Sequence, residues 1–292
     1  MIEGTIIKGI GGFYYVQTEN GVVQCRARGI FRETNITPLV GDRVRIRISE
    51  EDNNGYVEEI FERESVLLRP PVANVTQAVI VSSIKDPELN TWLLDRMLVM
   101  AEEQELEVLI CINKCELDPD GAKQMGEIYK GAGYDTILTS VKQKQGLEEL
   151  KDFMEDHISV FAGPSGVGKS SLLNSINSNY DLEIGKISLK TSRGKHTTRH
   201  VELLRLNKNS FVLDSPGFSS LNLDFVEDEG QLRFYYKDIE QYNGRCKFSS
   251  CIHVNEPGCA VKEAVESNII SSERHKNYLM MIEEIKKRKR RY

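Results

Sequence analysis

The N-terminal part of the chain alternates between apolar and polar side chains. Residues 43–48 read Arg-Val-Arg-Ile-Arg-Ile, and residues 23–28 show the same period of two. This period predicts strands with one buried and one exposed face. Asn20-Gly21 is a strong signal for a hairpin turn, and Asn53-Asn54-Gly55 is a second expected turn. Four or five short strands in about 60 residues predict a small closed barrel of the OB-fold type over residues 1–64.

A second pattern, in which apolar runs alternate with helical segments, follows from residue 65 onward. The expected buried strands are the apolar runs at 78–81, 107–112, 136–138, 158–162 and 211–213. Helical periodicity is clearest at 93–105, and shorter helices are expected at 125–131 and 147–154. Strands that alternate with helices predict a mostly parallel sheet with both faces covered, so we expect an α/β domain over residues 65–218. Its boundary with the barrel is expected between about residues 62 and 73, where Arg69-Pro70-Pro71 cannot continue a helix or lie in the middle of a sheet.

The composition changes again after residue 218, and we expect a mainly helical domain over residues 219–292. One helix is predicted at 232–242 and a final one from Ser272 onward. The apolar face of the final helix is marked by Leu279, Ile282 and Ile285. The chain then carries six successive basic residues, Lys286–Arg291, which are expected to repel one another and extend. A solvated tail is one interpretation, and contact with nucleic-acid phosphates is the one we favour.

The composition is that of a soluble globular protein, with 292 residues, 40% hydrophobic and 28% charged. The formal net charge of −6 excludes a chain that is basic throughout. Taken alone, the arginines on the outer face of the barrel indicate a solvated surface more than a nucleic-acid platform. No apolar run approaches the ~20 residues that a bilayer span needs, and the start of the chain has no signal-peptide pattern, so we expect a cytoplasmic protein without membrane contact. Six cysteines in such a protein are expected to be thiols or metal ligands rather than disulfides.

The clearest chemical motif lies between the strand at 158–162 and a helix expected to start near residue 172. It reads Gly163-Pro164-Ser165-Gly166-Val167-Gly168-Lys169-Ser170-Ser171 and fits the phosphate-binding loop of nucleotide hydrolases. Glycines let the backbone N–H groups wrap a triphosphate, and the helix N-terminus adds partial positive charge. Lys169 is expected to reach the β- and γ-phosphates, and the Ser170 hydroxyl to bind Mg²⁺. An ordinary Gly-rich turn is the alternative, which the full pattern in this context disfavours.

Three further segments follow predicted strands and are expected at the same edge of the sheet, where parallel sheets bind their ligands. Asn113-Lys114-Cys115-Glu116 follows the strand at 107–112 and resembles the guanine motif of GTPases, with Glu116 where a shorter aspartate is usual. Ser140, after the strand at 136–138, fits the weaker last guanine motif. Asp214-Ser215-Pro216-Gly217 fits the motif in which Asp214 holds Mg²⁺ through water and the Gly217 N–H contacts the γ-phosphate.

Residues 194–199, Gly-Lys-His-Thr-Thr-Arg, have the polar character of a mobile switch. One threonine, Thr197 or Thr198, would complete the Mg²⁺ shell, and we assign Thr198. Phe218 stands where many GTPases have a water-orienting glutamine, so His196 is the polar candidate for that catalytic role beside Lys169. A histidine that only neighbours phosphate or solvent is the alternative. The guanine motifs precede the phosphate loop, an order that indicates a circular permutation and sends the segment after Asp214 straight into the C-terminal domain.

A cluster of metal-ligand residues lies in the C-terminal domain. Cys246-x4-Cys251-x-His253-x5-Cys259 supplies the four ligands of a closed tetrahedral zinc site. A complete set leaves no open position, so one structural Zn²⁺ is expected rather than a catalytic one. Chance proximity is the alternative. The other cysteines, Cys25, Cys111 and Cys115, are scattered and are expected to be unligated.

These features together resemble the ribosome small-subunit-dependent GTPase A (RsgA) family. The resemblance covers nearly the whole chain and is most specific at the phosphate loop, at Gly194-Lys195-His196-Thr197-Thr198 and at the zinc spacing, while Glu116 departs from the pattern. It implies a GTPase that binds the small (30S) ribosomal subunit and 16S rRNA late in maturation and leaves after hydrolysing GTP to GDP. It also supports the OB-fold and the role of His196. We further expect a monomer whose turnover is slow without its partner, because no arginine finger is evident in the sequence.

Two other functions stay open. The protein could be an RNA-docking scaffold in which nucleotide only sets attachment and release. It could also be a nucleotidase that uses ATP or acts on a metabolite, which the guanine motif opposes.

Overall fold

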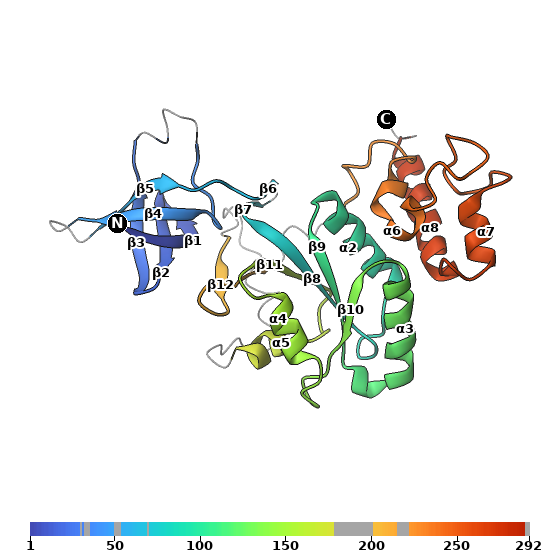
Figure 1. Ribbon diagram of the computed structural model, residues 1–292, viewed down its shortest axis with the longest axis horizontal. Helices are drawn as coiled ribbons and strands as arrows, with labels where there is room; N and C mark the ends of the chain where they lie inside the picture. The colour runs from blue at the N-terminus through green and yellow to red at the C-terminus, as the bar shows by residue number, and fades with distance from the viewer. Residues whose placement is uncertain are drawn as a thin grey trace.

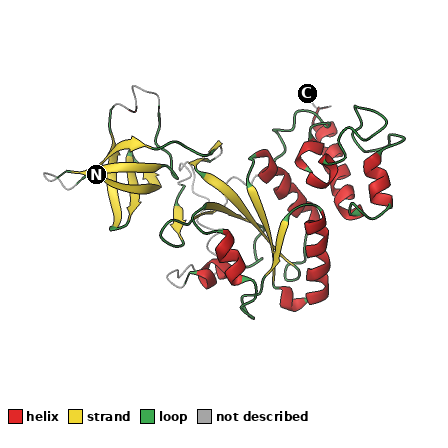
Figure 2. Ribbon diagram, viewed as in Figure 1, coloured by secondary structure: helices red, strands yellow, loops and turns green. Residues whose placement is uncertain are grey.

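The computed structural model describes residues 1–29, 31, 36–49, 54–68, 70–177, 201–214 and 222–289. They form an N-terminal barrel, a central sheet flanked by helices and a C-terminal group of helices, which follow one another along the longest axis (Figure 1). Strands dominate the first part and helices the last (Figure 2). Among the described residues, none of the helices combines the length and the apolar character that crossing a bilayer requires.

The N-terminal barrel confirms the predicted all-β domain. Its strands β1 (Ile2–Ile10), β2 (Phe13–Thr18), β3 (Gly21–Ala27), β4 (Arg43–Ile48) and β5 (Gly55–Ile60) close in the order β1-β2-β3-β5-β4. Asn20-Gly21 makes the β2–β3 hairpin, with Thr18 paired to Gly21. Val44 and Ile46 are fully buried, as the period of two predicts, while Arg43 and Arg47 are exposed and Arg45 is half-buried. Ile48 departs from the pattern, because it is exposed at the end of the strand. The barrel interior is therefore filled by alternate side chains of its strands.

The linker after the barrel forms a short antiparallel pair, β6 (Val66–Leu68) and β7 (Pro71–Ala73). Pro71 begins β7 and pairs with Leu68, so it lies at the end of a two-stranded pair and not in the middle of a sheet. A two-stranded pair tolerates it because the first residue of a strand need not donate to a ladder. Arg63 fastens the linker to the barrel through two bonds to the buried Asp42 carboxylate, at 2.7 and 2.8 Å.

The central sheet has the order β10-β9-β8-β11-β13-β12 and confirms the predicted parallel sheet. Its strands are β8 (Val75–Ser83), β9 (Glu107–Asn113), β10 (Asp135–Leu138), β11 (Ile158–Ala162), β12 (Leu203–Arg205) and β13 (Phe211–Asp214). All neighbouring strands run parallel except β12, a short edge strand that sequence reasoning missed and that pairs antiparallel with β13. The four strands from β10 to β11 thus end at the same edge as β13.

Helices cover both faces of this sheet (Figure 1). The helices are α2 (Thr91–Glu103), α3 (Pro119–Gly131), α4 (Leu147–Phe153) and α5 (Lys169–Ile176), with a short 3₁₀ helix η1 at Cys115–Leu117. Leu94 of α2 and Ala122 of α3 share a core with Ile80 and Ile110. Leu150 of α4 and Leu172 of α5 pack against the opposite face, with Val79, Val81 and Leu109. The strands are buried on both faces, which explains their continuous apolar runs.

The C-terminal domain has its own core, built around Val261, Tyr278 and Ile282. Its elements are η2 (Leu232–Tyr235), α6 (Lys237–Glu240), α7 (Ala260–Glu266) and α8 (Ser272–Lys289). The single helix predicted at 232–242 is therefore divided, because Tyr236 between η2 and α6 has an extended backbone. Sequence reasoning did not predict α7.

The prediction that the basic run extends is wrong over residues 286–289, which complete α8. Arg288 Nη1 donates to the Leu223 carbonyl at 2.7 Å, and its Nη2 donates to the Val226 carbonyl. Lys289 Nζ lies 2.8 Å from an Asp228 oxygen and 2.9 Å from a Glu229 oxygen. Self-repulsion is offset because the segment at 223–229 supplies acceptors and acidic partners; residues 290–292 lie outside the described part of the chain.

Candidate functional site

The predicted phosphate and guanine segments meet at the carboxyl edge of the central sheet. Asn113 ends β9, Ser140 follows β10, and the loop at 163–168 connects β11 to α5. Asp214 ends β13, where its backbone pairs in register with Phe161 of β11. Parallel strands end at one edge, so segments distant in the sequence converge there.

The phosphate loop turns tightly at its glycines. Gly163 has φ of +147°, and a side chain there would collide with the Val81 carbonyl. Gly168 has φ of +96° and caps α5, and a Cβ there would lie 2.5 Å from Asn113 Nδ2. Lys169 Nζ donates to the loop carbonyls of Gly163, at 2.7 Å, and Pro164, at 2.9 Å. The loop therefore closes around the lysine ammonium, at the positive end of α5.

The Asn-Lys segment binds this loop directly. Asn113 Nδ2 donates to the Val167 carbonyl at 2.8 Å. Lys114 Nζ donates to the Gly166 carbonyl at 2.9 Å and also to the Asp86 carbonyl. Two side chains of one segment thus fix two successive carbonyls of the other, so the base-recognition and phosphate-recognition segments form one unit.

Glu116 presents an unused acceptor beside this unit. Its Oε2 is buried and has no hydrogen-bond partner among the described residues. A buried carboxylate oxygen without a donor is costly, and the N–H groups of a guanine base are donors of the kind it lacks. Ser140 Oγ accepts from the Gln143 N–H at 3.1 Å, which orders the neighbouring loop. These residues fit a guanine base by the chemistry of their donors and acceptors.

Several predicted site residues fall where the structure gives no side-chain description. His196, Thr198 and Gly217 lie outside the described residues, and for Asp214 only the backbone is described. Ser170 lies in the first turn of α5 and is buried. The assignments of these residues to water, Mg²⁺ and the γ-phosphate stay predictions.

Sequence reasoning missed the loop after β8, residues 84–90. The Asp86 carbonyl accepts from Lys114, and a Cβ at Gly166 would lie 3.5 Å from Pro87 Cδ. The signal was available, because β8 belongs to the same parallel sheet and its carboxyl end lies at the same edge.

The arginines of the barrel have acidic neighbours. Arg45 pairs with Glu59 at 2.6 Å and Glu3 at 3.1 Å, while Glu58 pairs with both Arg28 and Arg47. This mixed charge favours the solvated-face interpretation of these arginines. A nucleic-acid platform on the barrel stays a prediction.

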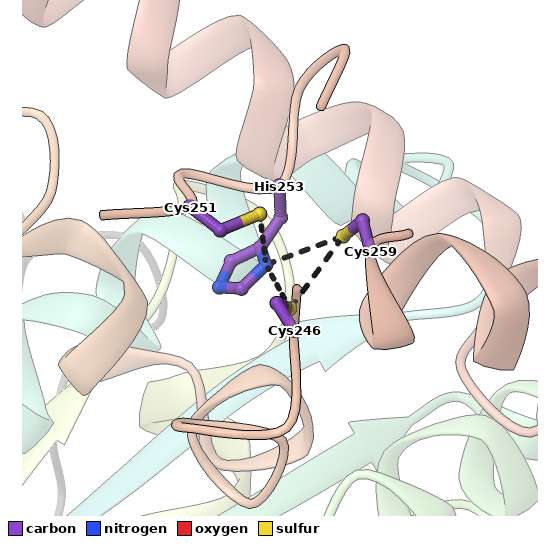
Figure 3. A group of neighbouring side chains, drawn as sticks. All are labelled: Cys246, Cys251, His253 and Cys259. Atoms are coloured by element: carbon purple, nitrogen blue, oxygen red, sulfur yellow. Dashed lines mark hydrogen bonds between the residues drawn. The ribbon is translucent and has the colours of Figure 1, made fainter. Parts of the chain in front are cut away.

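The predicted cysteine and histidine ligands lie together in the C-terminal domain (Figure 3). One ligand atom from each of Cys246, Cys251, His253 and Cys259 lies within 4.8 Å of all the others. His253 Nδ1 is 3.6, 3.5 and 3.4 Å from the three sulfurs in that order. Burial, assisted by the Arg233 charge, lowers the pKa of His253 to about 4, so its imidazole is neutral and can ligate. The cluster can hold a metal ion, and its soft donors fit zinc.

Comparison with known proteins places the chain in a family. The model of the RsgA GTPase matches residues 60–224, and that of the RsgA N-terminal domain matches residues 3–57. A protein of Caldanaerobacter subterraneus subsp. tengcongensis named small ribosomal subunit biogenesis GTPase RsgA is 49% identical, over 100% of this chain and 98% of its own. One of the same name from Alkaliphilus metalliredigens is 48% identical, over 99% and 100%.

The chain belongs to the RsgA GTPase family. Two solved structures agree with its fold. YloQ, described as a circularly permuted GTPase, has a TM-score of 0.78 and 42% identity, over 99% of this chain and 96% of its own. YjeQ from Thermotoga maritima has a TM-score of 0.80 and 37% identity, over 97% and 98%. These similarities confirm the predicted family and the permuted fold.

Proposed function

We propose that this RsgA family member is a GTPase that hydrolyses GTP to GDP and phosphate in the biogenesis of the small ribosomal subunit. The observation that carries the proposal is the union of the two recognition segments, in which Asn113 and Lys114 bind the carbonyls of Val167 and Gly166. The unpaired Glu116 oxygen beside them supports guanine as the base. The ribosomal part rests on the names of the relatives.

Nucleotide binding would use the loop at 163–171 as the phosphate cradle. The Lys169 ammonium lies within hydrogen-bond distance of two carbonyls of this loop, so it is placed to bind the oxygens of a triphosphate held there. Ser170, Asp214 and Thr198 would hold Mg²⁺, which supplies neutralising charge when bound. The Gly217 N–H would contact the γ-phosphate, and Ser140 would border the base with Cys115 and Glu116.

Hydrolysis would then need only positioning and charge neutralisation. Water attacks the γ-phosphate in line, Lys169 stabilises the negative charge that develops, and His196 orients the water. Slow turnover alone and faster turnover on the 30S subunit are expected, since no arginine finger was found in the sequence. The C-terminal cluster would hold one structural zinc, and 16S rRNA would be the nucleic-acid partner of a cytoplasmic monomer.

The test is GTP turnover measured alone and with purified small subunits, large subunits or free RNA. We expect stimulation by small subunits only, and its loss in Lys169→Ala. Lys151→Ala, an exposed lysine whose weak pair with Glu148 is 3.9 Å long, is the matched control. Wild-type protein that showed no turnover under any of these conditions would contradict the proposal.

Two outcomes would support the other functions. If Lys169→Ala abolished hydrolysis while subunit maturation proceeded normally, the RNA-docking scaffold would be favoured. If ATP and GTP competed equally for the site against a fluorescent nucleotide, a less specific nucleotidase would be favoured.

A further inference from the structure

A buried chain of hydrogen bonds lies behind the guanine motif. Cys111 Sγ is 3.0 Å from Thr139 Oγ1, and the Thr139 hydroxyl is 3.1 Å from Asn113 Oδ1. The Asn113 amide continues the chain from Nδ2 to the Val167 carbonyl, at 2.8 Å. Cys111 and Thr139 are fully buried, and Asn113 is 2% exposed, so water does not replace these partners.

The donors and acceptors available to these groups fix the direction of every hydrogen bond in the series. The Val167 carbonyl can only accept, so the amide must turn its Nδ2 toward it and its Oδ1 toward Thr139. Oδ1 then requires a donor, which the Thr139 hydroxyl supplies with its single proton. Toward Cys111 the hydroxyl can therefore only accept, and the thiol donates. Burial raises the pKa of the Cys111 thiol to about 12, so it keeps that proton.

The backbone and the packing hold Thr139 in place for this role. Its N–H donates to the Ile112 carbonyl at 2.9 Å, and its own carbonyl accepts from the Cys115 N–H at 3.2 Å. A Cβ at Gly146 would lie 3.0 Å from the Thr139 methyl carbon, so this side chain is confined by a glycine with φ of +67°. The hydroxyl is thus aimed at Asn113 by the fold.

We propose that Thr139 is a positioning residue for nucleotide binding, which acts by fixing the orientation of the Asn113 amide with Cys111 behind it. Without the hydroxyl, Asn113 Oδ1 is left buried without its donor, and the contact with the Val167 carbonyl alone holds the amide in this orientation. A flipped amide would place Oδ1 against the Val167 carbonyl, and two acceptors repel each other. The N–H groups that follow Val167 would then lose their fixed aim at the phosphates. This inference rests on the proposed function, because it concerns how the same site holds GTP and GDP.

The experiment compares Thr139→Val with wild type in the full-length protein, using a fluorescent GDP analogue and competition by GTP. Valine keeps the shape and removes the hydroxyl, so we expect affinity for both nucleotides to fall about tenfold, through faster dissociation. Thr139→Ser should restore the affinity to within about twofold, because it returns the donor. Thr136→Val is the matched control, since Thr136 is buried on β10, the strand that ends just before Thr139, and its hydroxyl donates to the Tyr134 carbonyl at 3.2 Å.

Two measurements separate positioning from a merely structural role. In combination with Asn113→Ala, Thr139→Val should cause no further loss, because its effect passes through the amide. Cys111→Ala should weaken binding about threefold, less than Thr139→Val, since a thiol is a weak donor; it also tests the chain if the Thr139→Val protein does not fold.

Equal affinities in wild type, Thr139→Val and Cys111→Ala would overturn the inference, as would full additivity with Asn113→Ala. A loss of nucleotide affinity in Thr136→Val as large as that in Thr139→Val would also overturn the inference. Wild-type protein that bound no guanine nucleotide would overturn both this inference and the proposed function.

Discussion

The ion pairs between the central domain and the barrel are exposed, whereas the central domain and the C-terminal domain share a buried ionic cluster. Lys8 pairs with Glu202 at 3.0 Å, and their side chains are 29% and 49% exposed. Lys208 pairs with Glu19 in a still more exposed setting. The linker adds buried contacts: the Ala73 N–H donates to the Val40 carbonyl at 2.8 Å, and Asn74 Nδ2 donates to the Gly41 carbonyl at 2.9 Å. Val72 belongs to an apolar core that is continuous between the barrel and the sheet.

The C-terminal junction is organised by Arg274 of α8, which is 2% exposed. Its guanidinium binds Asp238 of α6 through two bonds, at 2.8 and 2.9 Å, and also binds Asp95 of α2. Asn277 Nδ2 donates a hydrogen bond to the other carboxylate oxygen of Asp95, at 2.7 Å. The rings around the guanidinium, 5.0 to 5.7 Å from it, are those of Tyr129, Tyr134 and Tyr236.

This difference has a mechanical consequence. Exposed ion pairs contribute about 0–1 kcal/mol, whereas removing one partner of a buried pair costs about 3–5 kcal/mol. The C-terminal domain is therefore expected to move together with α2 and the sheet. The barrel is expected to be the domain that changes its orientation when a large partner binds.

The largest expected effect is that of metal removal from the C-terminal cluster. A structural zinc contributes more to folding than any single side-chain contact, so a strong chelator should unfold the C-terminal core while the barrel and sheet stay folded. Trp92, which packs against that core, gives the fluorescence signal. The Cys246→Ser variant should be as unstable before chelation as the wild-type protein is after it, and the chelator should not lower its stability further. An unchanged unfolding curve after metal loss, verified by elemental analysis, would contradict this prediction.

The second-largest effect is expected from a substitution that breaks the buried cluster around Arg274. Arg274→Met leaves the carboxylates of Asp95 and Asp238 buried together without a cation, so the free energy of unfolding should fall by about 3–5 kcal/mol. Urea unfolding followed by Trp92 fluorescence measures it. Arg245→Met is the control, since Arg245 is exposed beside the Tyr242 ring and should change stability by less than about 0.5 kcal/mol. Equal effects of the two substitutions would refute the comparison.

The same cluster also predicts that the free energy of unfolding depends on pH. Burial, only partly offset by Arg274, raises the pKa of Asp95 to about 6 from its ordinary value of 3.8. Between these values the unfolded chain has released the proton and the folded protein still holds it, so the contribution of Asp95 to stability falls as pH rises from about 4 to about 6, by about 2–3 kcal/mol.

The measurement is the stability difference between Asp95→Asn and wild type across this range. Asparagine stays neutral at every pH. The free energy of unfolding of the variant should therefore rise relative to that of wild type from pH 4 to pH 6, and the difference should stay constant above pH 6. A difference that did not change with pH would show that Asp95 is ionised in the folded protein throughout.

The smallest expected effect lies at the barrel junction. Lys8→Ala removes the pair with Glu202, and because both side chains are partly exposed it should lower the free energy of unfolding by at most about 0.5 kcal/mol. Added salt should reduce even this difference. Small-angle scattering would show whether the barrel becomes more variable in orientation. A loss above about 2 kcal/mol would mean that this junction is as firm as the C-terminal one.

Sequence reasoning succeeded where local patterns carry the information. The period of two at 43–48 gave the barrel strand, and the apolar runs at 78–81 and 107–112 gave the strands β8 and β9. The phosphate loop was identified by its glycines, which its close contact with Asn113 requires. The loop after β8 was missed because it contributes a carbonyl group, which no residue type marks, and only its position at the carboxyl end of β8 indicated it.

It failed where a distant partner decides the outcome. The basic end of α8 was expected to extend, but its Arg288 and Lys289 find acceptors and acids about 60 residues earlier in the chain, at 223–229. The short β12 forms only because β13 offers an edge, and its own three residues carry no strand pattern of note.

The sequence by itself determined the barrel, the parallel sheet, the phosphate and guanine motifs and the metal ligands, because each depends on residues close together in the chain. Only the tertiary structure decided how the domains are joined. Arg274 lies 36 residues from Asp238 and 179 from Asp95, and no local pattern links them. The same holds for the hydroxyl of Thr139 and the amide of Asn113, 26 residues apart, which meet because neighbouring parallel strands end at one edge.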